Sequence, residues 1–177
     1  MTLESATAKK DVIKLMFVLD VTGSMGDELS YLQTELADVI KRVAKDTNTR
    51  IDLAFLFYRD DGDDEKMSYV EFSTVNDETN LNKQLKYLKA QSANGGGDMP
   101  EAVDEALEIA VTANWGEENA TRLIFHVLDA PPHSEEKNKT RFEKAVKVAA
   151  AKGIRICPIL CSGANELCEY LVRQEAI

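Results

Sequence analysis

Apolar runs and amphipathic stretches alternate along this chain. Four runs are apolar at nearly every position, which is typical of strands buried on both faces of a parallel sheet. Between the runs, apolar residues recur at spacings of three and four, which predicts helices with one buried face. The predicted strands are residues 12–19, 51–58, 67–73, 122–128 and 154–160. The predicted helices are residues 26–45, 81–89, 100–113, 142–152 and 165–173.

The order of these elements predicts the fold class. Strand–helix alternation with short connections favours a doubly wound α/β domain, with a mostly parallel central sheet and helices on both faces. Residues 67–73 follow the strand at 51–58 after a polar turn, so we expect one antiparallel edge strand. The helix at 165–173 has no strand after it. We favour a chain that is a piece of a longer one and lacks the last strand of its sheet; the alternative is a sheet that ends one strand early.

Composition and charge narrow the classes of function. The chain has 21 Lys+Arg against 31 Asp+Glu, a net charge of −10, and such a surface repels the phosphates of a nucleic acid. No apolar run reaches the roughly 20 residues that cross a bilayer. The polar tail at residues 1–10 lacks the apolar core of a signal peptide. The three cysteines are not a disulfide framework. We therefore expect a cytoplasmic protein with no nucleic acid or membrane partner.

Side chains with oxygen donors follow the predicted strands. Asp20, Thr22 and Ser24 come after the first strand, Asp98 ends a glycine-rich loop, and Asp129 follows the strand at 122–128. Ligands of open α/β sheets bind at the carboxyl ends of the strands, so we expect these side chains to converge. Carboxylates and hydroxyls are hard ligands that suit Mg²⁺, Mn²⁺ or Ca²⁺. The sequence therefore predicts a divalent cation at this edge of the sheet.

Some of these residues also have an interpretation without a metal. Thr22 and Ser24 are of the types that cap helices, and Asp98 with Glu101 forms a capping box. Asp20 and Asp129 are harder to explain by capping. Two carboxylates at adjacent buried strand ends repel each other unless a cation lies between them.

His133 and the acidic run at residues 60–65 each allow two interpretations. We interpret His133 as an ordinary loop histidine, and the alternative is a gate or a partner contact. We interpret the acidic run at residues 60–65 as a solvated hairpin turn, because it lacks the spacing of an EF-hand. The alternative for Asp60 is a place beside the metal ligands.

The motifs around these residues resemble those of the von Willebrand factor type A (vWA) domain. Residues 20–24 (Asp-Val-Thr-Gly-Ser) resemble its Asp-x-Ser/Thr-x-Ser signature. Residues 95–98 resemble its Gly-Gly-x-Thr loop, with aspartate in the place of threonine, and Asp129 matches its final aspartate. Residues 58–60 (Tyr-Arg-Asp), 95–102 (Gly-Gly-Gly-Asp-x-Pro-Glu-Ala) and 129–133 (Asp-Ala-Pro-Pro-His) resemble one subgroup. The expected domains are the polar tail 1–10 and a Rossmann-like vWA domain over 11–177.

The resemblance implies a function. It implies a metal-ion-dependent adhesion site (MIDAS) that holds Mg²⁺, or Mn²⁺ or Ca²⁺. The implied metal ligands are Asp20, Thr22, Ser24, Asp98 and Asp129. Members of the family mostly bind proteins and are not enzymes, so we expect the recruitment domain of a larger protein. The net charge of −10 favours a partner with a basic surface.

Two other functions stay open on the sequence alone. One is a metal-assisted phosphatase or hydrolase with Asp20 as the nucleophile at the strand end. This is disfavoured because the three site loops offer no lysine for a phosphate and no acid two residues after Asp20. The other is a structural domain whose site has lapsed.

Overall fold

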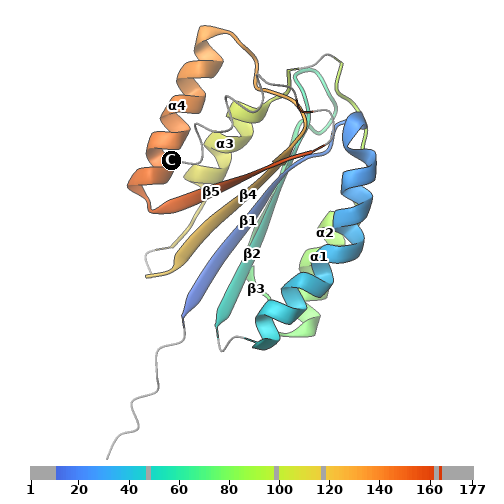
Figure 1. Ribbon diagram of the computed structural model, residues 1–177, viewed down its shortest axis with the longest axis vertical. Helices are drawn as coiled ribbons and strands as arrows, with labels where there is room; N and C mark the ends of the chain where they lie inside the picture. Colours follow the sequence, from blue (N-terminus) through green and yellow to red (C-terminus); the bar gives the residue numbers. More distant parts are fainter. Residues whose placement is uncertain (1–10, 47–48, 98–99, 117–118, 162–163, 165–177) are drawn as a thin grey trace, which may run out of the picture.

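A central sheet organises the part of the chain that the structure describes. The computed structural model describes residues 11–46, 49–97, 100–116, 119–161 and 164. Within these ranges five strands form one sheet in the order β3-β2-β1-β4-β5 (Figure 1). The strands are β1 (Val12–Asp20), β2 (Arg50–Tyr58), β3 (Met67–Thr74), β4 (Thr121–Leu128) and β5 (Ile154–Leu160). Only the edge pair β2–β3 is antiparallel, so the predicted fold class is confirmed.

Helices cover both faces of the sheet (Figure 1). On one face lie α1 (Gly26–Asp46) and α2 (Glu78–Lys89), and on the other lie α3 (Val103–Thr112) and α4 (Glu136–Ala151). Alternate residues of β1 enter the two cores: Phe17 packs on the α1–α2 side, and Met16 packs on the α3–α4 side. Burial on both faces is why the strand sequences are apolar at successive positions. None of these described helices is long and apolar enough to cross a membrane.

Three of the described helices begin elsewhere than the periodicity predicts. α2 begins at Glu78, three residues before the predicted start, because the side chain of Asp77 caps the helix by accepting from the N–H of Asn80. α3 begins at Val103 rather than at 100, because the backbone N–H of Glu101 donates to the carbonyl of Pro131 at 3.0 Å, which keeps this segment extended. α4 begins at Glu136, six residues before the predicted start, because its first turns are polar and hide the apolar period. The predicted helix at 165–173 and the tail at 1–10 lie outside the described residues.

The sheet order brings two of the predicted site segments together. The chain leaves β1 towards β2 on one side, whereas β4 is the parallel neighbour of β1 on the other side. Leu19 pairs with Val127, so Asp20 and Asp129 follow at the same edge of the sheet. The strand order reverses between β1 and β4, and ligands of doubly wound sheets bind at such a point.

Candidate metal centre

Asp20 ends β1 with one carboxylate oxygen bound and the other without a partner. Its side chain is buried, with 1 % of its surface exposed. Oδ1 accepts a hydrogen bond of 2.6 Å from the hydroxyl of Thr22 and one of 2.9 Å from the backbone N–H of Thr22. Oδ2 has no hydrogen-bond partner among the described residues. A buried anionic oxygen without a partner is rare in proteins, and a cation is one of its explanations.

The hydroxyls of Thr22 and Ser24 lie next to this carboxylate. The two oxygens are 3.4 Å apart, with Thr22 buried and Ser24 exposed. Thr22 precedes the short helix η1 (Gly23–Met25), but its side chain makes no capping hydrogen bond. The capping interpretation of Thr22 is therefore wrong, because its hydroxyl is used on Asp20.

Asp129 supplies the second carboxylate at this edge. It follows β4, is 5 % exposed, and its Oδ1 has no hydrogen-bond partner within the described ranges. Burial above all, and then the charge of Asp129, raise the pKa of Asp20 to about 6, against the hydrogen bonds from Thr22. The two carboxylates thus lie close enough to repel each other, as expected from the sequence, and a cation between them would relieve the repulsion.

Glu101 is a third buried carboxylate, at a position where the sequence pattern predicts a capping box with Asp98. It is 3 % exposed, and its Oε2 has no partner in the described part of the chain. Burial raises its pKa to about 9, and the charges of Asp20, Asp60, Asp63 and Asp129 add to the shift. The N-cap of α3 is Ala102, so the capping-box interpretation of Asp98 and Glu101 is wrong. The Pro-Glu-Ala end of the subgroup motif was the available signal for Glu101.

The glycine-rich loop packs tightly against the loop after β1. The carbonyl of Gly95 accepts a hydrogen bond of 3.1 Å from the N–H of Gly23. Gly95 and Gly96 both have a φ of 76°, in the left-handed region that favours glycine. A Cβ on Gly96 would lie 2.9 Å from Oε1 of Glu101 and 3.1 Å from Cβ of Thr22, so only glycine fits there. Asp98, the next predicted ligand, lies outside the described residues.

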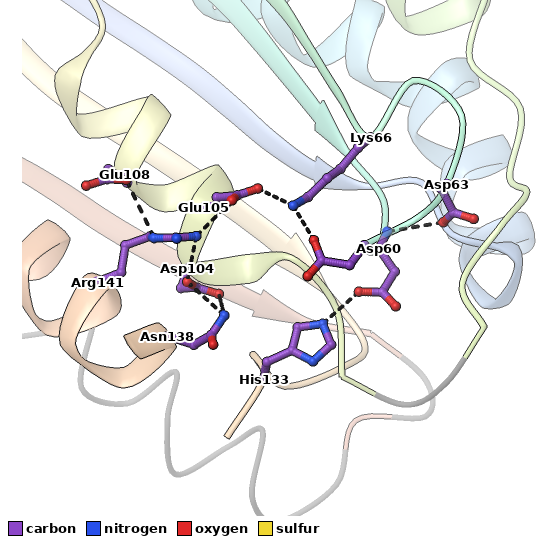
Figure 2. Close-up of polar contacts among 10 residues, drawn as sticks. Asp60, Asp63, Lys66, Asp104, Glu105, Glu108, His133, Asn138 and Arg141 are labelled. Carbon is purple, nitrogen blue, oxygen red and sulfur yellow. Dashed lines mark hydrogen bonds and ion pairs between the residues drawn. The ribbon is translucent and has the colours of Figure 1, made fainter. Parts of the chain in front are cut away.

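The turn between β2 and β3 is tied to the same edge by Asp60 and Asp63. Figure 2 shows Nε2 of His133 pointing at Oδ1 of Asp60, at 2.8 Å. Oδ2 of Asp63 accepts from the N–H of Asp60 at 3.1 Å and from the N–H of Gly96 at 2.9 Å. The hairpin turn is confirmed, but Asp60 is buried rather than solvated, and His133 is the hydrogen-bond partner of Asp60 rather than an ordinary loop histidine.

Two basic side chains near this edge, Lys66 and Arg141, form ion pairs with acidic groups outside the predicted metal set. Lys66 forms ion pairs with Asp61 and Glu105, and Arg141 forms them with Asp104, Glu105 and Glu108 (Figure 2). These contacts join the β2–β3 turn, α3 and α4. Burial alone would lower the pKa of His133, but the hydrogen bond and charge of Asp60 raise it.

A comparison with protein families identifies the fold. A family model described as the von Willebrand factor A domain matches residues 14–175. The chain belongs to the von Willebrand factor A domain family. The vWA resemblance drawn from the sequence is therefore confirmed, and the resemblance to a MIDAS stays a prediction.

The relatives of this A domain are much longer proteins. It is 26 % identical over 133 residues to the alpha-protein kinase vwkA of Dictyostelium discoideum, covering 74 % of this chain and 20 % of the relative. It is also 28 % identical over 135 residues to the putative ariadne-like RING finger protein R811 of Acanthamoeba polyphaga mimivirus. This match covers 76 % of this chain and 13 % of that protein. The A domain thus spans a fifth or less of the length of these curated relatives.

Solved structures show the same fold at low identity. The pilus adhesin SpaC from Lactobacillus rhamnosus GG, in its open conformation, superposes with a TM-score of 0.70 at 9 % identity, covering 95 % of this chain and 26 % of the adhesin. A second form of that adhesin superposes with a TM-score of 0.70 at 10 % identity, and the match covers 95 % of this chain and 27 % of the adhesin. At this identity the likeness concerns the fold alone.

The donor set of this A domain fits a hard divalent cation. The described residues group no three His, Cys, Asp or Glu side chains closely enough to hold a metal by themselves. Of the predicted set, the structure describes two carboxylates, Asp20 and Asp129, and the hydroxyls of Thr22 and Ser24, whereas the third carboxylate, Asp98, lies outside the described residues. The unpartnered oxygens of Asp20 and Asp129 fit such an ion.

Proposed function

We propose that this A domain is a divalent-metal-dependent protein-binding module. The ion, Mg²⁺ or else Mn²⁺ or Ca²⁺, lies at the carboxyl ends of β1 and β4 and offers one coordination position to a partner protein. The observation that carries the proposal is the pair of buried oxygens, Oδ2 of Asp20 and Oδ1 of Asp129, that have no partner among the described residues. Buried carboxylates without compensation are costly, and an ion removes that cost.

Each proposed ligand has a distinct part. Asp20 offers Oδ2, because Thr22 already occupies Oδ1. The Thr22 and Ser24 hydroxyls extend the site towards solvent, since Ser24 is exposed. Asp129 closes the site from β4, and the fifth proposed ligand is Asp98, which lies outside the described residues. Ends of buried strands are rigid, so the ion would be presented in a fixed direction.

The partner and the larger protein follow from charge and from the relatives. The net charge of −10 favours a partner with a basic surface. Two relatives are a protein named as a kinase and one named as a RING finger protein, each several times longer than the A domain. We infer a recruitment domain within a larger cytoplasmic protein, and we propose no catalytic role for Asp20.

The proposal is tested by titrating Mn²⁺ into the chain and into Asp129→Asn in a calorimeter. Asp129→Asn keeps the size of the side chain and removes its charge, so we expect metal affinity to fall by about tenfold or more. Asp38→Asn, the same change on the exposed face of α1, is the matched control and should bind as the unaltered chain does. Equal affinities in all three chains would refute the metal site.

A further inference from the structure

Asp63 lies in the turn between β2 and β3, yet its carboxylate is bound to the glycine-rich loop, 33 residues further along the chain. We propose that Asp63 is a positioning residue of the metal site, which holds the glycine-rich loop and, through that loop, the hydroxyls of Thr22 and Ser24. This inference rests on the proposed metal site, and it adds a residue that acts on the proposed ligands through another segment.

The turn gives the side chain of Asp63 a defined place. The backbone N–H of Asp63 donates to the carbonyl of Asp60 at 3.3 Å, and Oδ2 of Asp63 accepts from the N–H of Asp60 at 3.1 Å (Figure 2). Aspartate commonly closes turns through such side chain to backbone hydrogen bonds. The N–H of Arg59 donates to the carbonyl of Lys66 at 2.9 Å, which closes the hairpin around the turn. Asp63 is partly buried, whereas the next residue, Asp64, is exposed.

The same oxygen of Asp63 anchors the glycine-rich loop. Oδ2 accepts a second hydrogen bond, of 2.9 Å, from the N–H of Gly96. The carboxylate also lies directly against Gly95, where a Cβ would overlap it. Gly95 and Gly96 both have a φ of 76°. Glycine loses more conformational freedom on folding than any other residue, so a loop built from successive glycines keeps one conformation only if other groups hold it.

The glycine-rich loop in turn supports the loop after β1. The carbonyl of Gly95 accepts a hydrogen bond of 3.1 Å from the N–H of Gly23, and the N–H of Asn94 donates to the carbonyl of Val21 at 3.1 Å. The two proposed hydroxyl ligands lie next to Gly23, one on each side of it in the sequence. A shift of the glycine-rich loop would therefore shift both hydroxyls relative to Asp20.

The preferences of the ion make such a shift costly. Mg²⁺ demands nearly ideal octahedral geometry at about 2.1 Å, and water takes the positions that the protein does not fill. A hydroxyl that moves away from the ion is consequently replaced by water. Groups that orient metal ligands commonly contribute tenfold to a hundredfold to metal affinity. For this role Asp63 needs an acceptor oxygen in the right place, and it does not need its charge.

This requirement distinguishes positioning from an electrostatic role. Asp63→Asn removes the charge, but its amide oxygen has two lone pairs and can accept from both N–H groups. Asp63→Glu keeps the charge and moves the carboxylate away by one methylene. If Asp63 acts by position, Asp63→Asn binds the metal better than Asp63→Glu does. If it acts by its negative charge, as a ligand or at a distance, the order is reversed.

The experiment titrates Mn²⁺ into the unaltered chain, Asp63→Asn, Asp63→Glu and Asp63→Ala in a calorimeter. We expect Asp63→Asn to bind within about threefold of the unaltered chain, and the other two variants to bind about tenfold to a hundredfold more weakly. Asp64→Ala, at the exposed neighbour, is the matched control and should also stay within about threefold.

Water-proton relaxation of the chains saturated with Mn²⁺ gives a second readout. In Asp63→Ala and Asp63→Glu a water should take the place of a displaced hydroxyl, so the bound Mn²⁺ should carry more water than in the unaltered chain. Asp63→Asn should restore the relaxation of the unaltered chain. A residue that contributes only to the stability of the turn would leave the hydration of the bound ion unchanged, and that result would overturn the inference.

The possible results separate this inference from the proposed function. If Asp20→Ala binds Mn²⁺ as tightly as the unaltered chain does, the metal site is wrong and the role of Asp63 falls with it. If Asp20→Ala loses Mn²⁺ but Asp63→Asn binds it no better than Asp63→Glu, only the inference is overturned. This comparison does not depend on Asp63→Ala, so it holds even if that variant does not fold.

Discussion

Thr22 donates two hydrogen bonds to a single oxygen of Asp20. The hydroxyl bond is 2.6 Å long and the backbone N–H bond is 2.9 Å long, and both end on Oδ1. Two donors on one oxygen fix the orientation of the carboxylate, and its other oxygen, Oδ2, is left without a partner in the described part of the chain. Partners of this kind orient metal ligands, and losing one commonly costs tenfold to a hundredfold in metal affinity.

Replacing Thr22 tests this relationship. Thr22→Val removes the hydroxyl and nearly keeps the shape, so the metal-free chain should lose about 1–3 kcal/mol of unfolding free energy in urea. Its affinity for Mn²⁺ in a calorimeter should fall by about tenfold to a hundredfold. Thr22→Ser keeps the donor and is the matched control. Equal metal affinity of the valine and serine variants would show that the hydroxyl plays no part.

Asp98 tests the charge of the site. Asp20, Asp98 and Asp129 would bring three negative charges against the two positive charges of the ion. Asp98→Thr restores the residue that the resemblance leads one to expect, so the metal should bind less tightly and acetate should bind the metal more tightly, by roughly a hundredfold. Titration calorimetry with Mn²⁺ and then with acetate measures both effects. Unchanged metal affinity would exclude Asp98 from the site.

The buried carboxyls predict how stability of the metal-free chain depends on pH. Burial raises the pKa of Asp20 to about 6 and that of Glu101 to about 9, so folding favours their protonated forms. This stabilisation is complete at pH values below about 4, the pKa of both carboxyls in the unfolded chain. It is lost as the pH rises through about 6 for Asp20 and then through about 9 for Glu101. The melting temperature should therefore fall between pH 5 and pH 9, and less steeply in Glu101→Gln. If the melting temperatures of the unaltered chain and of Glu101→Gln fall equally with pH, burial does not raise the pKa of Glu101.

His133 predicts a pH effect through a raised pKa of its own. Asp60 favours the protonated imidazole, so the pair stabilises the fold fully below about pH 6.5 and the gain is lost as pH rises through the raised pKa of His133. His133→Gln should cost up to about 1 kcal/mol at pH 5.5 and less at pH 9. Urea unfolding at the two pH values measures this, and a cost that does not change with pH would count against the ion pair.

The site residues that could be predicted from the sequence are those that end or directly follow a buried strand. Asp20 and Asp129 each follow a run of residues buried on both faces, so their place at one edge of the sheet follows from local pattern and sheet topology. The vWA motifs strengthened this prediction. The apolar run at residues 154–160 likewise predicts a strand, and β5 spans Ile154–Leu160.

The burial of Glu101 could not be predicted because it depends on a contact distant in sequence. Asp98 and Glu101 have the spacing of a helix start, yet the bond from Glu101 to Pro131 keeps the segment extended. The acidic pattern of residues 60–65 predicts a solvated turn, and the burial of Asp60 departs from it for a similar reason. Its partner, His133, lies 73 residues away, and nothing in the local pattern links the two.

The proposed metal site depends above all on Asp20, the buried carboxylate that ends β1. Mg²⁺ and Mn²⁺ are titrated into the unaltered chain and into Asp20→Ala, with circular dichroism to confirm that both are folded. We expect Asp20→Ala to remain folded, because the site lies outside the two cores, and to lose about a hundredfold or more of its metal affinity. Unchanged affinity in a folded Asp20→Ala would contradict the account.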